Sequence, residues 1–328
     1  MKNISSISER MWLAVNSRVK HLKDMYANDF LGYIVYGSLA RGNPSKHSDV
    51  DVMCIVKNHC QEEFKVFFWD ELVFAEHIRK ESYFNKELDS YTSRFAFAVL
   101  IDSRSDNLTA FLDRYSKYHK TPERQIRDET ALRSRITSII HNEHREPNEE
   151  MCFHVFSVVK QSMFYLYEKS GKTGTSSRLL HTLKVEQGND VFILLCNALG
   201  YNTLIPKNFE KNFEELTKLL RYLRRNVQYA KASYYEDILS HLLEEHFIDT
   251  SKAILQKGEP ECAFYVIQLY LNLILSDRGP FVENYGISDY WNIFKEENII
   301  NLDEYFNSYD VAKRLQVLNH ELGFEKNE

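Results

Sequence analysis

The stretch from residue 33 to residue 56 constrains the fold of this chain more than any other feature. Two apolar runs are separated there by a polar turn: the first ends in Gly37-Ser38, and the second begins with Asp49-Val50-Asp51. Apolar runs with a short polar connection are typical of neighbouring β-strands. Side chains two residues apart in a strand point to the same side, so Asp49 and Asp51 are expected to lie next to each other.

Two adjacent carboxylates need a partner, because like charges repel and ionised groups are costly to bury. A divalent cation would supply that partner for Asp49 and Asp51. The Gly37-Ser38 turn offers backbone N–H groups, which are suited to binding phosphate. The combination predicts chemistry on a metal-bound nucleoside triphosphate.

Composition narrows the class of protein. The chain has 328 residues, enough for two domains, and a formal net charge of −6. A negative net charge argues against a protein whose main function is to bind a long nucleic acid. The five cysteines include no CxxC pair, which favours buried thiols in a reducing compartment. The first residues do not resemble a signal peptide, and no apolar run is long enough for a membrane span, so we expect a cytoplasmic location without membrane contact.

The first part of the chain is predicted to mix helices and strands. An apolar stripe at helical spacing predicts a helix over 7–27, and a second helix is predicted over 61–69. Strands are predicted over 31–36, 49–56, 72–78 and 95–101. The predicted fold class is therefore α+β, with a small mixed sheet that carries helices on one face.

The remainder is predicted to be helical throughout. Thr121-Pro122-Glu123 is typical of a helix start with proline at the first helical position, and a further helix is expected from about residue 149. More helices are predicted near 177–185, 189–199, 210–229, 233–247, 260–276 and 303–320. We predict a catalytic domain over 1–118 and an all-α domain over 119–328 that binds the acceptor or acts as a lid.

The motif resembles the signature of a known superfamily. Gly37-Ser38, Arg41-Gly42 and Ser48-Asp49-Val50-Asp51 resemble the corresponding residues of the DNA polymerase β-like nucleotidyltransferases. A small α/β domain followed by helices is similar to the layout of bacterial aminoglycoside and lincosamide adenylyltransferases. The segment 99–108, an apolar run followed by an aspartate and a polar turn, also resembles those enzymes.

The resemblance implies a Mg²⁺-dependent reaction in which an acceptor hydroxyl attacks the α-phosphate of an NTP, ATP being the expected donor, and pyrophosphate leaves. Two Mg²⁺ ions would clamp the attacking and leaving oxygens. The implied metal ligands and catalytic residues are Asp49, Asp51 and Glu76. The implied nucleotide-binding residues are Gly37, Ser38, Arg41 and Ser48.

Two assignments stay open at this point. The superfamily usually takes a third carboxylate from a neighbouring strand; Glu76 in the strand predicted over 72–78 is our choice, with Glu71 and Glu81 as rivals. Related adenylyltransferases often take a general base from a later glutamate. The candidates, which nothing in the sequence separates, are Glu143, Glu149 and Glu150.

Three functions are compatible with the motif. A small-molecule acceptor such as an aminoglycoside or lincosamide antibiotic is favoured, since an acidic chain suits a cationic aminoglycoside. A tRNA or protein acceptor, as in toxin–antitoxin nucleotidyltransferases, would be favoured by a basic surface. A catalytically silent nucleotide-binding module is the third hypothesis. The sequence makes no prediction of the oligomeric state.

Overall fold

The computed structural model describes residues 2–44, 48–88, 93–141, 149–170, 178–205, 209–226, 236–276 and 308–324. The chain divides into two compact units. One unit comprises Met1–Gln125 with Ser233–Leu242, and the other comprises Ile126–Ala232 with Leu243–Glu328. The predicted domain boundary between residues 118 and 119 stays a prediction.

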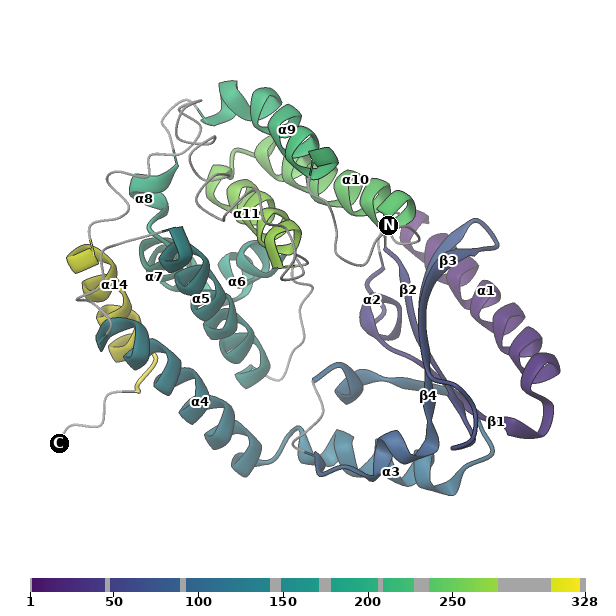
Figure 1. Cartoon of the computed structure of the whole chain (residues 1–328). Coiled ribbons are helices and arrows are strands. Elements are labelled where there is room, and N and C mark those ends of the chain that lie inside the picture. Colours follow the sequence, from purple (N-terminus) through teal and green to yellow (C-terminus); the bar gives the residue numbers. More distant parts are fainter. Residues whose placement is uncertain are drawn as a thin grey trace. The chain divides into compact units, whose positions relative to one another are not determined.

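A five-stranded sheet forms the centre of the first unit (Figure 1). Its strands in spatial order are β3 (Glu63–Trp69), β4 (Leu72–Lys80), β2 (Val50–Val56), β1 (Phe30–Val35) and β5 (Val99–Ser103). β2 and β4 are parallel, whereas the other neighbours are antiparallel. The prediction of a small mixed sheet is therefore confirmed.

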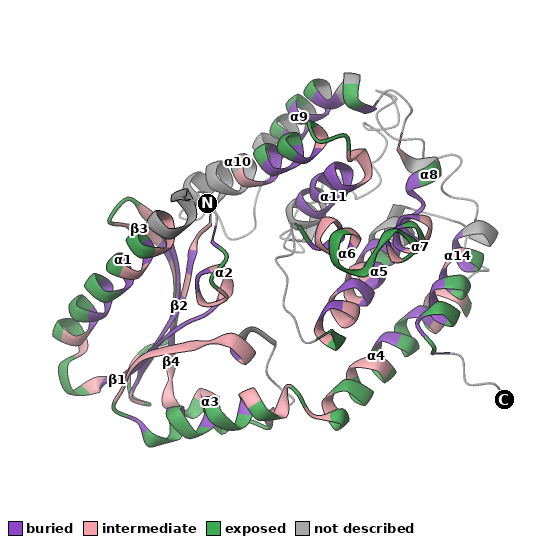
Figure 2. Cartoon of the chain, turned by 180° about the vertical axis from the view of Figure 1, so that it is seen from behind, coloured by how far each residue is buried: buried purple, intermediate pink, exposed green. Residues whose placement is uncertain are grey.

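One face of the sheet packs on α1 (Lys2–Tyr26). The apolar stripe of this helix includes Met11, Val15 and Leu22, all fully buried. This stripe packs against sheet residues that point to the same face, among them Tyr33 and Val52. Figure 2 shows the buried side of α1 turned toward the sheet. Burial of this stripe explains why a helix forms at the position that the periodicity predicts.

The opposite face packs on α3 (Asp106–Tyr118) and two 3₁₀ helices, η2 (Glu81–Asn85) and η4 (Ser93–Phe97). Met53 and Ile55 of β2 lie in this second core, with Phe111 and Tyr115 of α3. The predicted α+β class is confirmed, but helices cover both faces and not one. Ser105 caps α3 by accepting a hydrogen bond from the Leu108 N–H at 3.3 Å.

Two predicted elements of the first unit need correction. Residues 61–69 were expected to be helical, yet 63–69 form the edge strand β3. Pairing with β4 along the whole length, from Glu63↔Ile78 to Trp69↔Leu72, decides the conformation of this segment, because tertiary pairing overrides a weak local preference. The strand predicted over 95–101 begins only at Val99, since η4 occupies 93–97.

The later part of the chain is helical, as predicted, among the residues described. Its longest elements are α4 (Pro122–His141), α5 (Glu149–Lys169), α9 (Phe209–Asn226), α10 (Glu236–Leu255) and α11 (Pro260–Ser276). Shorter ones are α6 (Leu179–Gln187), α7 (Asn189–Leu199), α8 (Tyr201–Leu204) and α14 (Ser308–Glu321). The helix start predicted at Pro122 is confirmed, and the Thr121 hydroxyl accepts the Arg124 N–H at 3.3 Å. Among the helices described, none is long and apolar enough to cross a membrane.

Candidate active site

Gly37 and Asp51 form the centre of the predicted site. The Tyr36 N–H donates to the Asp51 carbonyl oxygen at 3.0 Å, which extends the pairing of β1 with β2 to the start of α2 (Gly37–Ala40). Gly37 has φ +71°, and a Cβ added there would lie 1.9 Å from Asp51 Oδ2. A side chain at position 37 would therefore collide with this carboxylate. The sequence prediction that the glycine turn and an aspartate of the Asp-x-Asp motif lie together agrees with this geometry.

Arg41 ends α2 beside this carboxylate. Burial lowers the pKa of its guanidinium, and the charge of Asp51 acts in the opposite direction. Its Nε atom is buried and has no hydrogen-bond partner among the described residues. A half-buried guanidinium with an unsatisfied donor is suited to bind an anion such as phosphate.

Asp49 and Ser48 lie just ahead of β2, so the predicted strand begins one residue later than expected. Both side chains are half-buried. Burial raises the pKa of the Asp49 carboxyl, against the lowering effect of its own backbone N–H. Because Asp49 is two residues before Asp51, an extended chain directs the two side chains to the same side. A desolvated carboxyl of this kind gains from a nearby cation.

Ser38 is the second residue of α2, and its side chain is half-buried. Its carbonyl oxygen accepts the Asn43 N–H at 3.0 Å, and the Gly37 carbonyl oxygen accepts the Arg41 N–H at 3.3 Å. These bonds close α2 and the turn at its C-terminal end. Ser38 therefore lies at the start of α2, directly after Gly37.

Glu76 does not lie with Asp51, and its proposed place among the metal ligands is contradicted by the register of the sheet. Val52 pairs with Glu76, and Asp51 pairs with Ala75. Residues that pair across neighbouring strands point to the same face, so Glu76 points toward α1 and Asp51 points away from it. The Glu76 side chain has no exposed surface.

A buried ion pair accounts for Glu76 instead. Arg18 of α1 donates from Nη2 to Oε1 at 2.6 Å and from Nε to Oε2 at 2.9 Å. The Tyr33 hydroxyl donates to Oε2 at 3.1 Å. The guanidinium also stacks over the rings of Phe67 and Trp69, 4.6 Å and 4.9 Å from their centroids. Glu76 is fully occupied by protein donors and holds α1 to the sheet.

One signal in the sequence could have revealed this pair. Arg18 interrupts the apolar stripe of α1, next to Val19 and one turn after Val15. A cation inside a buried stripe requires a buried anion. A single carboxylate in an apolar strand, as Glu76 is in β4, is the matching anion.

The two rivals of Glu76 also have other partners. Glu71 is exposed at the β3–β4 turn and accepts a hydrogen bond from Arg10 at 2.7 Å. Glu81 accepts a hydrogen bond from the Ser105 hydroxyl. Among the three candidates for the general base, Glu143 lies outside the described residues, and Glu149 and Glu150 begin α5 with side chains that are not described.

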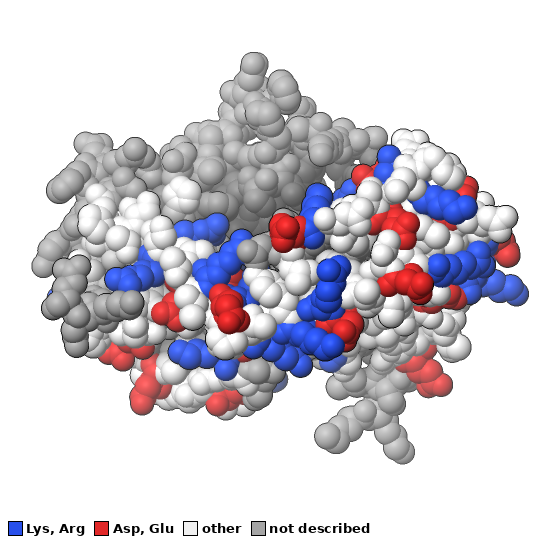
Figure 3. All heavy atoms as spheres, turned by 90° about the horizontal axis from the view of Figure 1, so that it is seen from below, with Lys and Arg blue, Asp and Glu red and all other residues white. Residues whose placement is uncertain are grey.

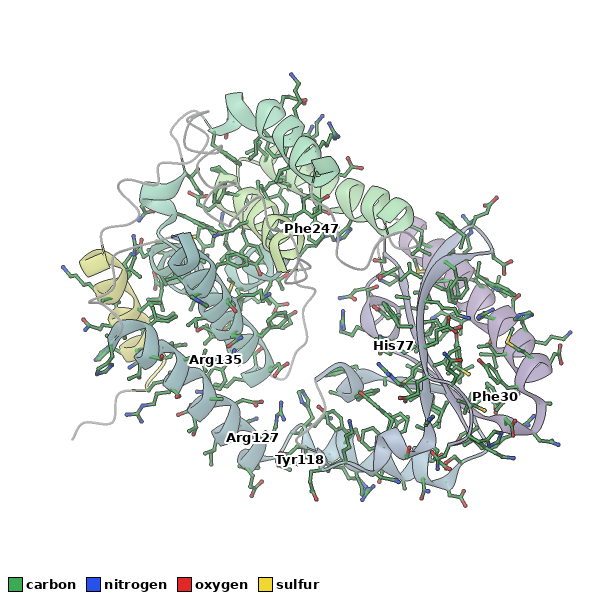
Figure 4. The ribbon with its side chains drawn as sticks, viewed as in Figure 1. Phe30, His77, Tyr118, Arg127, Arg135 and Phe247 are labelled. Atoms are coloured by element: carbon green, nitrogen blue, oxygen red, sulfur yellow. The ribbon has the colours of Figure 1, made fainter. Side chains whose placement is uncertain are left out.

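The neighbours of Asp51 on β4 were missed by sequence reasoning. Ala75 pairs with Asp51, and His77, one step along the same face, pairs with Met53. Figure 4 shows His77 on the side of the sheet away from α1 and Phe30 on the side of α1. His77 stacks on Phe64 of β3, with ring centroids 4.2 Å apart. A histidine and an alanine thus occupy the stretch of β4 where a third carboxylate was predicted.

The donor set at Asp49 and Asp51 fits one Mg²⁺. This ion is usually held by one or two carboxylates together with substrate phosphates. Within the described residues, no third histidine, cysteine or acidic side chain gathers with these two aspartates into a cluster of metal-binding spacing. A second ion, as predicted from the resemblance, would require further ligands.

Residues 19–105 match the family model of the nucleotidyltransferase domain. This segment contains the whole site: Gly37, Arg41, Asp49 and Asp51 with the strands that carry them. The first unit therefore carries a nucleotidyltransferase domain, and a helical region follows it. The match supports nucleotidyl transfer as the reaction class of the chain.

A solved structure of a nucleotidyltransferase-like protein from Exiguobacterium sibiricum 255-15 also resembles the chain. It is 12% identical, and the similarity covers 85% of this chain and 90% of that one with a TM-score of 0.33. A comparison with curated proteins gave no match.

Proposed function

We propose that this chain is a Mg²⁺-dependent nucleotidyltransferase that moves a nucleoside monophosphate, AMP from ATP, to a hydroxyl of a small-molecule acceptor and releases pyrophosphate. The observation that carries the proposal is the fit of the Gly37 backbone against the Asp51 carboxylate inside a nucleotidyltransferase domain. Only glycine allows this approach, which supports a role for the turn in phosphate binding and for Asp51 as a metal ligand.

The residues have separate roles in this proposal. Asp49 and Asp51 would hold the metal ion, which supplies charge neutralisation of the triphosphate when it is bound. The backbone N–H groups and hydroxyl of Gly37-Ser38 would orient the β- and γ-phosphates, and Ser48 would line the same turn. Arg41 supports phosphate binding through its buried, unsatisfied Nε. Glu76 takes no part in the chemistry and holds the scaffold.

An antibiotic acceptor, an aminoglycoside or a lincosamide, is the more specific form of the proposal. It rests on the resemblance in layout and on the acidic balance of the chain, whose formal net charge is −6. Figure 3 shows acidic and basic side chains interspersed on the face that it draws. Such a mixture does not favour a long RNA, for which a basic surface is typical. A cytoplasmic location belongs to the same proposal.

The experiment is a transfer assay with the full chain. Each α-labelled NTP is incubated with Mg²⁺ and a panel of aminoglycosides, lincosamides, tRNA and protein, and both labelled product and pyrophosphate are measured. We expect label from ATP on a small molecule, and no pyrophosphate with Asp51→Asn. The exposed Asp113→Asn on α3 is the matched control and should keep full activity. Label on tRNA or protein only would reject the small acceptor, and ATP binding without any pyrophosphate would reject the enzyme.

A further inference from the structure

A second group of potential metal ligands lies in the helical unit. His181 of α6, Glu259 just before α11 and Cys262 in the first turn of α11 each direct one donor atom to a common point. These three atoms lie within 4.8 Å of one another. α6 and α11 are neighbours in this unit (Figure 1).

The surrounding core fixes the positions of these donors. Leu179, Leu180 and Leu183 are fully buried and determine which side of α6 faces the unit's core, so His181 lies at its edge. Cys262 is 1% exposed and belongs to the same core. The side chains of His181 and Glu259 keep 27% and 17% of their surface exposed. The group thus has one buried end and one end that an ion can reach from solvent.

An ion pair explains part of this arrangement but not all of it. His181 Nδ1 and Glu259 Oε2 are 2.6 Å apart, and Lys184 Nζ donates to Glu259 Oε1 at 3.1 Å. These contacts account for the carboxylate and its two cationic neighbours. They give no reason for a thiol sulfur at the same point, within reach of both the imidazole and the carboxylate.

The donor types match those of zinc sites. Zn²⁺ is bound by imidazole nitrogen, carboxylate oxygen and thiolate sulfur at about 2.0–2.3 Å. Tetrahedral geometry then places the donor atoms roughly 3.3–3.8 Å from one another. Donors that already lie within 4.8 Å need only a small adjustment of side chains to reach that spacing. Lys184 on the other carboxylate oxygen would orient Glu259, as outer partners of metal ligands do.

We propose that His181, Glu259 and Cys262 form a binding site for a zinc-type divalent cation, with the fourth position open to solvent. The site is independent of nucleotidyl transfer and of the proposed Mg²⁺ ligands. Burial and the charge of Glu259 raise the pKa of the Cys262 thiol to about 12, so binding must displace the thiol proton. The positive charge of Lys184 opposes a cation, which limits the affinity.

The test uses the full-length chain, freed of metal with a chelator and then titrated with Co²⁺ as a spectroscopic probe. We expect a thiolate-to-Co²⁺ charge-transfer band that reports one ion per chain at this site and that Zn²⁺ abolishes by competition. Cys262→Ser should remove the band and weaken Zn²⁺ binding at least about 100-fold.

Two control variants separate this site from others. Cys54→Ala removes a buried thiol of the first unit and should leave the band unchanged. Cys60→Ser tests the other mixed cluster, formed by Asp29, His59 and Cys60. Absence of the band in the unmodified chain, its survival in Cys262→Ser, or its loss in Cys60→Ser would each overturn the proposal. Oxygen ligands give no such band, so binding of Co²⁺ at the nucleotide site cannot imitate the result.

Discussion

Glu76 and Asp51 lie on opposite faces of the sheet and have different surroundings. Toward α1, Glu76 is enclosed and takes hydrogen bonds from Arg18 and Tyr33. On the other face, Asp51 lies against the bare backbone of Gly37, beside Arg41, whose Nε has no hydrogen-bond partner in the part of the chain that the structure describes. The two carboxylates come from neighbouring strands, and their register differs by one residue. On one face protein donors satisfy the carboxylate of Glu76, whereas on the other face the carboxylate of Asp51 lies against a backbone that carries no side chain.

The largest effect is expected on the face that carries Asp51. Asp51→Asn should lower nucleotidyl transfer at least about a thousandfold, because removal of a metal ligand forfeits several kcal/mol of transition-state stabilisation. Its melting temperature should change less than its activity, because asparagine keeps the shape of the side chain and removes only its charge. A steady-state assay and a thermal melt on the same sample check both statements. Turnover close to that of the unmodified protein would contradict the assignment of Asp51.

Glu76→Gln tests the opposite face and should reverse this pattern. The substitution leaves the Arg18 guanidinium buried without its anion, which typically destabilises a fold by about 3–5 kcal/mol. Denaturant unfolding measures that loss, whereas transfer per folded molecule should be retained. The double variant Arg18→Met with Glu76→Leu should recover most of the stability, because apolar replacements of a buried pair are often neutral. Loss of transfer by folded Glu76→Gln would restore Glu76 to the metal site.

Gly37→Ala sharpens the contrast by altering only the contact with Asp51. A positive φ is unfavourable for alanine by about 1–3 kcal/mol, and the new Cβ would displace the Asp51 carboxylate. Gly42→Ala is the matched control, because Gly42 also has a positive φ, +74°, but an added Cβ meets nothing within 4 Å. We expect lower melting temperatures in both variants, with the larger loss in Gly37→Ala, and loss of transfer only in Gly37→Ala. Equal activities would show that the close approach is unimportant.

The smallest effect concerns Tyr33 and pH. Burial and the charge of Glu76 raise the pKa of the Tyr33 hydroxyl well above its usual value. In the unfolded chain this tyrosine releases its proton near pH 10, whereas in the fold it keeps it, so its contribution to stability falls as pH rises above about 10. Tyr33→Phe should cost about 1 kcal/mol at pH 8 and reduce that alkaline loss. Unfolding curves at pH 8 and pH 11 measure this difference. If the assignment is wrong, Tyr33→Phe will lose as much folding stability between these two pH values as the unmodified protein does.

Much of the architecture follows from local patterns. The helix start at Pro122 and the helix over 260–276 could be predicted because capping residues and a 3.6-residue repeat act within one segment. The segment 61–69 could not, because its charged and apolar residues fit a helix or a strand, and only pairing with β4 makes it β3. The 3₁₀ helix η4 could not be predicted from local patterns either, because its Phe95 packs in the core with Phe111 of α3.

The sequence by itself determined the motif and the residues that make it: a Gly-Ser turn after an apolar run, and two aspartates at a spacing of two. The spacing of the aspartates acts within a few residues, whereas the approach of Gly37 to Asp51 depends on the pairing of β1 with β2. The tertiary structure decided which face each side chain of β4 occupies. That choice depends on the register of β4 against β2, where a shift of one residue exchanges the faces, and on the buried Arg18 that draws Glu76 toward α1.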